Sequence, residues 1–199
     1  MINLFNYINL PGILQKHFEG LHPWVITGQA KEIIESISTQ LNTDEFVIKE
    51  GVAIHRNAVV EQHVVLKGPV IISENCFVGA HAYLRGGVFL DHHVSVGPGC
   101  EIKSSFLLAH AALAHFNFVG DSILGSRVNM EAGSIIANHY NERQDKLISV
   151  KANGEIISTG ITKFGALVGD DTKIGANAVL SPGTILEKDT VVKRLQLVN

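Results

Sequence analysis

The chain has 199 residues and a mass of 21.5 kDa, which is enough for one medium domain with a short appendage. Hydrophobic residues make up 46% of it and charged residues 18%, a composition of globular rather than disordered proteins. Sixteen Lys and Arg against nineteen Asp and Glu leave a net charge of −3. This balance excludes a broad basic surface of the kind that binds nucleic acid or acidic lipid.

The chain carries few signals for an oxidising or membranous environment. Cys76 and Cys100 are too few for a disulfide framework, and neither a CxxC motif nor a Cys/His zinc-finger spacing occurs. No apolar run reaches the length of a membrane span, and the first residues lack the basic start and long apolar core of a signal peptide. We therefore expect a cytoplasmic protein with neither nucleic acid nor membrane as a partner.

Residues 1–45 are expected to form a separate N-terminal helical segment. Pro23 and Trp24 precede apolar residues that recur near the helical period. These residues are Ala30, Ile33, Ile34, Ile37 and Leu41. The three turn formers at 42–44 then end the pattern. We predict one or two short helices that pack on the domain that follows.

Residues 46–199 follow a period of six instead of the helical one. Every sixth residue is apolar in the series Ile48, Ile54, Val60, Leu66, Ile72, Val78, Leu84, Leu90, Val96, Ile102, Leu108 and Ala114. After a step of five, the series continues as Val119, Leu124, Met130 and Ile136, and later as Val168, Ile174, Leu180, Leu186 and Val192. Such a period is typical of a parallel β-helix, in which each hexad contributes one short strand and one turn.

Three hexads make one coil of eighteen residues, so the sequence predicts an all-β solenoid of about eight coils. The apolar residue of each hexad should point inward and stack on its equivalent one coil away, about 4.8 Å along the axis. Residues eighteen apart are therefore expected to be neighbours in space.

A long insertion at residues 137–163 interrupts the repeats. It holds two strand-like runs on either side of Asn153 and Gly154, the pair typical of a tight hairpin. Because long loops in compact proteins usually serve a function, we expect an arm that reaches over a site or a neighbouring subunit. A tolerated surface insertion is the alternative.

Four basic residues eighteen apart should form a vertical column. They are Lys49, Lys67, Arg85 and Lys103, and each directly follows an apolar residue of the series. Closely stacked cations repel one another unless an anion lies between them, so Arg85 and Lys103 are candidates to grip a phosphate. Four solvated charges on an exposed face are the alternative.

A histidine supplies the second candidate. By the same spacing of eighteen, His115 should stack above Gly97, Gly79 and Glu61. It follows the inward residue Ala114 and should lie on a different face from the basic column. Neutral imidazole is well suited to accept a proton near neutral pH. His115 is therefore either a general base or a surface histidine without a role.

Short sequence motifs around both candidate sites resemble a known family. Residues 115–122 (HFNFVGDS), 128–133 (VNMEAG) and 137–138 (AN) resemble the hexapeptide-repeat acyltransferase superfamily. They are similar to the acetyltransferase domain of bifunctional glucosamine-1-phosphate acetyltransferases/UDP-N-acetylglucosamine pyrophosphorylases and of related sugar-phosphate nucleotidyltransferases. The resemblance covers roughly residues 64–195, with 84–87 (LRGG) and 101–103 (EIK) at matching distances upstream. It implies that the coils wind left-handed.

The resemblance also implies a role for each candidate residue. His115 would be the general base that prepares an amino group to attack the thioester of acetyl-CoA. Arg85 and Lys103 would bind the phosphate of the sugar. The remaining implied residues are Asn129 and Asn138 for the substrate, the backbone of Ala132 for CoA, and Lys146.

Two positions depart from the family. Phe118 stands where the family has a tyrosine, and Lys146 matches the family's lysine only if residues are inserted before it. The family builds its sites between subunits, so a homotrimer is implied. A solenoid with uncovered faces also tends to bury them by association.

We therefore expect a CoA-dependent N-acetyltransferase, similar to glucosamine-1-phosphate N-acetyltransferases, with an amino-sugar phosphate or nucleotide-linked amino sugar as acceptor and no resident metal. Two alternatives stay open. One is a β-helix that binds a sugar nucleotide without catalysis. The other is a zinc enzyme like the gamma carbonic anhydrases, suggested by His110 five residues before His115 and by His92 and His93 one coil earlier.

Overall fold

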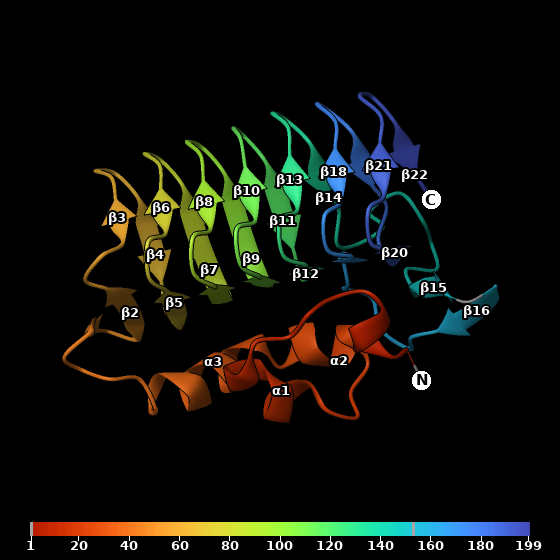
Figure 1. Cartoon of the computed structure of the whole chain (residues 1–199). Coiled ribbons are helices and arrows are strands. Elements are labelled where there is room, and N and C mark those ends of the chain that lie inside the picture. Colours follow the sequence, from red (N-terminus) through yellow and green to blue (C-terminus); the bar gives the residue numbers. More distant parts are fainter. Residues whose placement is uncertain (1, 153) are drawn as a thin grey trace.

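The computed structural model describes residues 2–152 and 154–199, and it consists of a β-helix with helices along one side (Figure 1). Strands of successive coils pair in parallel with equivalent residues in register. The predicted fold, a left-handed parallel β-helix with a helical N-terminal segment and an inserted hairpin, is confirmed. Within the described residues, no helix has the length and apolar content that a membrane crossing requires.

The β-helix has three faces, which the chain visits in the order A, B, C. Face A contains β2 (Val52–His55), β5 (Val70–Ile72), the second halves of β7 (Tyr83–Leu90) and β9 (Glu101–Leu107), β12 (Ile123–Leu124), β17 (Ala166–Val168) and β20 (Thr184–Leu186). Face B contains β3 (Val59–Val60), β6 (Phe77–Val78), β8 (Ser95–Val96), β10 (Ala112–Leu113), β13 (Asn129–Met130), β18 (Lys173–Ile174) and β21 (Val191–Val192). Face C contains β4 (Val65–Lys67), the first halves of β7 and β9, β11 (Phe118–Gly120), β14 (Ile135–Ile136), β19 (Val179–Leu180) and β22 (Leu197–Val198).

The first term of the six-residue series lies outside the coils. β1 (Phe46–Lys49) pairs antiparallel with β2, so Ile48 lies opposite Ala53 and is 42% exposed instead of filling the interior. The prediction that Ile48 begins the inward series is therefore wrong. The antiparallel pairing covers the first edge of the sheet, which would otherwise carry unpaired backbone groups.

The predicted five-residue step also lies elsewhere. Leu90 pairs with Leu107, and Val96 pairs with Leu113, so Leu107 and Leu113 point inward in place of Leu108 and Ala114. The cause is the corner after Lys103, where a single residue, Ser104, replaces Gly86 and Gly87 of the preceding coil. The step of five follows Ile102, and residues 108–118 are shifted by one from their expected places.

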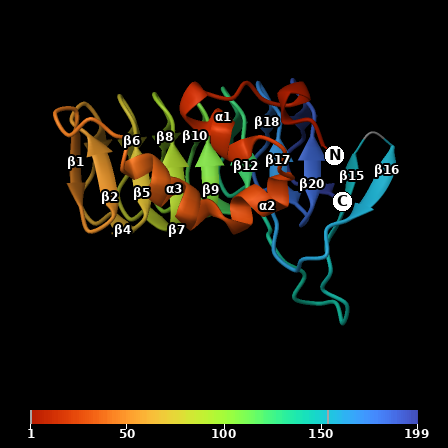
Figure 2. The ribbon, with the colours of Figure 1, turned by 90° about the horizontal axis from the view of Figure 1, so that it is seen from below.

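Face A is the covered face. Its outward side chains are apolar and almost fully buried: Ala53, Ile71, Phe89, Phe106, Ile123 and Leu167. The layer over them consists of η1 (Leu4–Asn6), α1 (Gly12–Phe18), α2 (Pro23–Gly28) and α3 (Ala30–Ser38) (Figure 2). The helix period of residues 30–37 thus arises because Ala30, Ile33, Ile34 and Ile37 face this sheet.

The insertion forms the expected hairpin. β15 (Ser149–Ala152) and β16 (Glu155–Ser158) pair antiparallel, and buried Ile148 and Val150 pack β15 beside β20. Asn153, which was expected in its turn, lies outside the described residues. The stretch between β14 and β15 extends beyond the ends of the strands, past the corner at which face C meets face A (Figure 2).

Asp170 fastens the N-terminal layer to the β-helix. Its side chain is 1% exposed and accepts hydrogen bonds from the backbone N–H groups of Asn9 (3.0 Å) and Ser126 (2.8 Å). Lys188 lies 3.5 Å from the same carboxylate, and the Asp170 N–H donates to the carbonyl of Tyr7. One buried carboxylate therefore links the first residues to the later coils.

Removing this carboxylate should loosen the layer. We expect Asp170→Ala to lower the free energy of unfolding by about 2–4 kcal/mol, because the buried N–H of Ser126 and the part-buried N–H of Asn9 lose their acceptor. Urea denaturation measures the loss, and hydrogen exchange should show faster exchange in residues 2–10. Asp44→Ala, which removes an exposed carboxylate, is the control, and equal stability of the two variants would contradict the role of Asp170.

Candidate functional site

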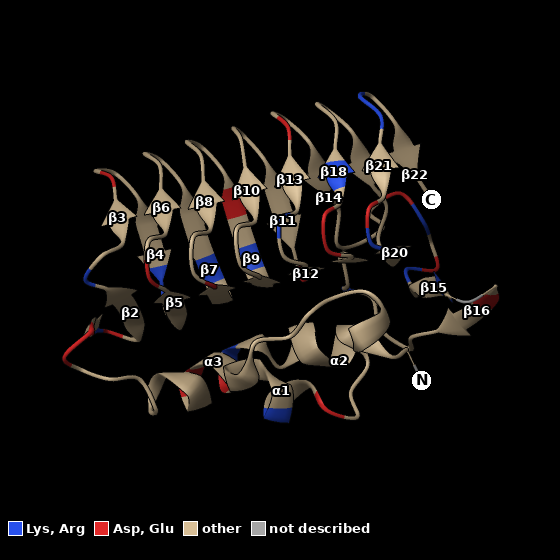
Figure 3. Ribbon diagram, in the orientation of Figure 1, with Lys and Arg blue, Asp and Glu red and all other residues tan. Residues whose placement is uncertain are grey.

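Three members of the basic column lie at the corner between face C and face A, called here the C–A corner. Lys67 pairs with Arg85, and Arg85 pairs with Lys103, in adjacent parallel strands. The blue segments of β4, β7 and β9 show this row (Figure 3). Lys49 does not belong to it, because β1 runs antiparallel and sets Lys49 opposite Val52. The predicted column of four is corrected to a column of three.

Both candidate phosphate ligands have carboxylate partners in the same chain. The Arg85 Nε and Nη2 atoms donate to Glu101 Oε1 at 2.9 and 2.6 Å. Lys103 Nζ lies 2.8 Å from both carboxylate oxygens of Asp121, and these two side chains are only 19% and 9% exposed. These carboxylates offset the mutual repulsion expected of the column.

Asn138 joins this cluster. Its amide donates to Asp121 Oδ2, an oxygen that Lys103 also contacts, and the residue itself is buried. The chain leaves the β-helix for the insertion directly after this contact and returns where the Phe164 N–H donates to the Asn138 carbonyl. Lys103, Asp121 and Asn138 therefore form a closed polar cluster at the base of the insertion.

His115 lies at the corner between face B and face C, called here the B–C corner. Because the register is shifted by one, Ala114 takes the place beside Gly97 that was predicted for His115. His115 instead lies between Pro98 and Ala132 of the adjoining coils. The Phe116 N–H donates to the Pro98 carbonyl, and the Gly133 N–H donates to the His115 carbonyl. His115 is exposed to solvent.

Glutamates cap the backbone of this corner in two coils but not beside His115. Glu61 accepts the Ala80 N–H at 2.7 Å, and Glu131 accepts the Ala176 N–H at 2.9 Å. In the coil before Ala132 the equivalent residue is Ala114, whose side chain has no acceptor. Within the described residues, no hydrogen bond uses the N–H of Ala132. A donor is therefore open one coil from an exposed imidazole.

Asn129 lines a groove on face B that the sequence did not indicate. The groove has a volume of about 280 Å³ and lies over β13, β18 and β21. Lys173 pairs with Asn129 in register, and Arg194 lies at the groove's edge with its Nε 2.8 Å from Glu131 Oε2. Because the insertion separates these residues by a number unrelated to eighteen, the column arithmetic missed Lys173 and Arg194.

The structure sorts the predicted residues into two groups and one outlier. His115, Ala132 and Asn129 share neighbouring coils at or near the B–C corner. Arg85, Lys103 and Asn138 share the C–A corner, at the opposite edge of face C. Lys146 is exposed in the stretch between β14 and β15, and no hydrogen bond or ion pair among the described residues joins it to either group.

The histidines proposed for zinc are separated. His110 precedes β10 and His115 follows it, so the two lie at opposite edges of face B. His110 instead stacks on His93 with ring centroids 4.7 Å apart, and His92 hydrogen-bonds Asp91 at 2.9 Å. In residues 2–152 and 154–199, no three His, Cys, Asp or Glu side chains are arranged to hold a metal ion.

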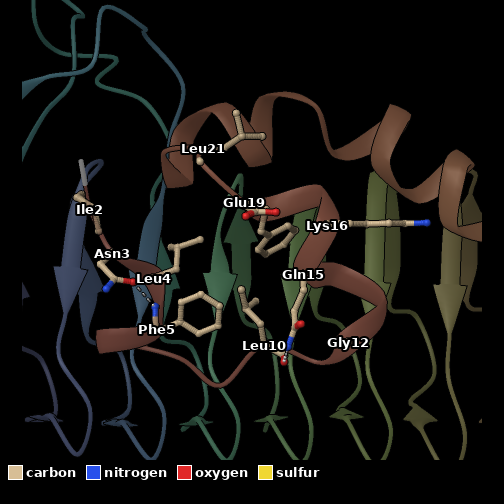
Figure 4. Close-up of a pocket in the computed structure, with 12 residues that line it drawn as sticks. Ile2, Asn3, Leu4, Phe5, Leu10, Gly12, Gln15, Lys16, Glu19 and Leu21 are labelled. Atoms are coloured by element: carbon tan, nitrogen blue, oxygen red, sulfur yellow. Dashed lines mark hydrogen bonds between the residues drawn. The ribbon is translucent and has the colours of Figure 1, made fainter.

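A cavity of about 550 Å³ lies within the N-terminal segment (Figure 4). Its lining includes apolar Leu4, Leu10, Phe18 and Leu21 and polar Gln15. None of the predicted site residues lines it. This cavity is separate from both corners.

Comparison with known families agrees with the repeat structure. Residues 66–162 match the GMPPB C-terminal domain family, and residues 165–193 match the hexapeptide repeat of succinyl-transferase. The chain is a hexapeptide-repeat protein. The two matches together run through both corners described above.

Curated relatives of this hexapeptide-repeat protein are longer enzymes. A bifunctional sugar-1-phosphate nucleotidylyltransferase/acetyltransferase of Sulfurisphaera tokodaii is 34% identical over 84 residues, which are 42% of this chain and 20% of the relative. The bifunctional protein GlmU of Methanococcus vannielii is 32% identical over 92 residues, 46% of this chain and 22% of the relative. The matched part thus spans about a fifth of these relatives.

Among solved structures, a hexapeptide transferase family protein from Anaplasma phagocytophilum is similar, with a TM-score of 0.47 and 14% identity. That similarity covers 78% of this chain and 79% of the other. PerB from Caulobacter crescentus, solved with CoA and GDP-perosamine, has a TM-score of 0.30 and 18% identity over 70% of this chain and 50% of its own.

The Glu131 contacts give the site a measurable pH dependence. Hydrogen bonds from Arg194 and from the Ala176 N–H lower the pKa of Glu131 from 4.5 to about 2. A lowered pKa in the folded state contributes stability that is present above pH 4.5 and lost as the pH falls toward 2.

Glu131→Gln should therefore lower the Tm near neutral pH, and the difference from the wild type should shrink as the pH falls below 4.5. Thermal melts followed by circular dichroism across this range test the expectation. Glu155→Gln, at an exposed position of the hairpin, is the control. A difference that stays constant with pH would refute the ion pair.

Proposed function

We propose that this hexapeptide-repeat protein is a CoA-dependent N-acetyltransferase that acts on an amino-sugar phosphate or a nucleotide-linked amino sugar. The observation that carries the proposal is the exposed imidazole of His115 one coil from the open N–H of Ala132. Matches to relatives named as acetyltransferases support the same reaction class.

The two groups suit the two charges that acetyl transfer creates. His115 accepts a proton from the acceptor's amine, whose nitrogen forms a bond to the carbonyl carbon of the acetyl thioester. The Ala132 N–H donates to the oxygen that becomes negative in the tetrahedral intermediate. The intermediate collapses with cleavage of the C–S bond, and the proton held by His115 passes to the thiolate of CoA.

CoA is proposed to extend over the groove on face B. Glu131 of the same groove pairs with Nε and Nη2 of Arg194, so Lys173 and the remaining Nη1 of Arg194 are the donors that suit the phosphates of the cofactor. Asn129, in register with Lys173, lies nearest to the His115 coil. This assignment accounts for a basic groove that begins beside the proposed reacting group.

The acceptor's phosphate is proposed to bind at the C–A corner. Glu101 occupies only Nε and Nη2 of Arg85, which leaves Nη1 to donate to a phosphate oxygen. Lys103, bound to Asp121, adds positive charge at close range. Asn138 and Lys146 of the insertion would complete this side of the acceptor site.

These corners lie at opposite edges of face C, so one site that uses both must combine two chains. We infer a homotrimer in which face C of each chain meets a neighbour. Face C supports this inference because it presents apolar residues to solvent: Val65, Ile135 and Leu197 are 47%, 37% and 59% exposed. Association would bury them.

The catalytic proposal predicts release of free thiol from acetyl-CoA with one or more amino-sugar phosphates. His115→Ala should reduce the rate by about 10²–10⁴-fold, the usual contribution of a general base. His110→Ala, at the other end of β10, is the matched control and should keep full activity. If the folded wild type released no thiol with any of the amino-sugar phosphates tested, a β-helix that binds a sugar nucleotide without catalysis would be favoured.

The trimer proposal predicts that Ile135→Lys dissociates the assembly, because a charge in the buried interface costs more than the contact gains. Sedimentation velocity should then show a single-chain species. Val59→Lys, on exposed face B, is the control and should leave the mass unchanged. A wild-type chain that sediments as a monomer would overturn the shared site.

A further inference from the structure

Phe116, the residue after the proposed base, has an unusual backbone and an unusual environment. Its φ is +53° and the residue is 73% exposed. The left-handed conformation is costly for a bulky side chain, and exposure leaves an aromatic ring in water. Strain combined with exposure points to a functional demand at this position.

Its equivalents in other coils show what the corner ordinarily accepts. Every residue of this column has a positive φ: His63, His81, Gly99, Phe116, Gly133, Asn177 and Leu195. Glycine, asparagine and histidine tolerate that conformation comparatively well. Phe116 and Leu195 both depart from this preference, and of the two only Phe116 lies next to His115.

The Phe116 ring leans toward the preceding coil. A Cβ atom at Gly99 would lie 2.6 Å from ring atom Cδ1. The ring therefore packs against Gly99, and any larger residue at position 99 would clash with it. Gly97 is equally restricted, because a Cβ there would overlap the Ala114 carbonyl. The surface beside His115 and Phe116 therefore has few side-chain atoms, because it consists of Gly97, Pro98 and Gly99.

The lean of the Phe116 ring toward the preceding coil matters because the acetyl donor and the acceptor are proposed to lie at different positions along the axis of the β-helix. The open N–H of Ala132 and the groove of Lys173 lie in the coils after His115. The Phe116 ring leans toward the coils before it, which hold Arg85 and Lys103, and Asn138 reaches the acceptor side from the later coil through Asp121, the partner of Lys103. On the proposed function, the acetyl donor takes the later coils, so Phe116 faces the acceptor.

We propose that Phe116 is a specificity-determining residue that stacks on the apolar C–H face of the acceptor's sugar ring. This inference rests on the proposed function. The amine that loses its proton to His115 is bonded to that ring, so the side chain next in sequence meets the ring rather than the phosphate or CoA. Aromatic rings pack well on such C–H faces.

The test compares the wild type with Phe116→Ala and Phe116→Tyr in steady-state thiol release, with both substrates varied. We expect Phe116→Ala to raise the KM of the acceptor about tenfold and leave the KM of acetyl-CoA within about twofold. Phe116→Tyr, which keeps the ring, should retain the acceptor KM. An unchanged acceptor KM, or a rise confined to acetyl-CoA, would overturn the inference.

Phe5→Ala is the matched control, since Phe5 is also exposed (60%) but lies in η1. It should change neither KM. Sedimentation velocity of Phe116→Ala tests whether the ring contacts a neighbouring chain instead of a sugar. Dissociation of the assembly in this variant would place the ring in an interface and overturn the proposal.

A stability measurement tests the strain. Phe116→Asn should raise the Tm by about 2–4 °C while weakening acceptor use, because asparagine tolerates a positive φ. Leu195→Asn should raise the Tm without changing either KM. A lower Tm for Phe116→Asn would show that the ring serves packing and would overturn the proposal.

A binding measurement separates this inference from the proposed function. If the wild type releases no thiol, the catalytic proposal fails, and millimolar glucosamine-1-phosphate is used as a probe in thermal shift. A rise in the wild-type Tm that Phe116→Ala loses supports stacking on a sugar. A shift that persists in Phe116→Ala, or no shift in the wild type, overturns it.

Discussion

Parallel pairing between coils is the constraint on which the rest of this molecule depends. It holds equivalent residues of successive coils one strand spacing apart, so each corner position has fixed neighbours above and below. Side chains at the corners therefore interact along the axis more than around the coil. Lys103 with Asp121, Glu131 with Ala176 and Phe116 with Gly99 are all contacts of this kind.

The same constraint explains why the candidate site has two halves. A rigid coil holds its corners a full strand apart, and no movement of His115 alone brings it to Lys103. Face A is closed by the N-terminal layer, which Asp170 fastens to the later coils. Faces B and C remain for ligands and for other chains, and the apolar residues of face C favour contact with another chain.

Much of this architecture is predictable from the sequence because period and burial are tied together. The hexad period predicts the β-helix, and the Lys67, Arg85 and Lys103 column follows from simple arithmetic. The outward apolar residues of face A, such as Phe89 and Phe106, also carry a readable signal that this face is covered. Local turn chemistry was harder to predict, since Ser104 alone replaces two glycines and shifts His115 by one position.

What the sequence could not supply was the pairing of charges and of backbone donors. Arithmetic aligned the cations of the column but did not reveal that Glu101 and Asp121 had already paired with them. It likewise could not distinguish a capped N–H from an open one, since that depends on whether the residue one coil earlier has a carboxylate. Ala114 in the place taken by Glu61 and Glu131 leaves the donor of Ala132 open beside His115. The chemistry proposed for this corner thus follows from a missing cap as much as from the histidine itself.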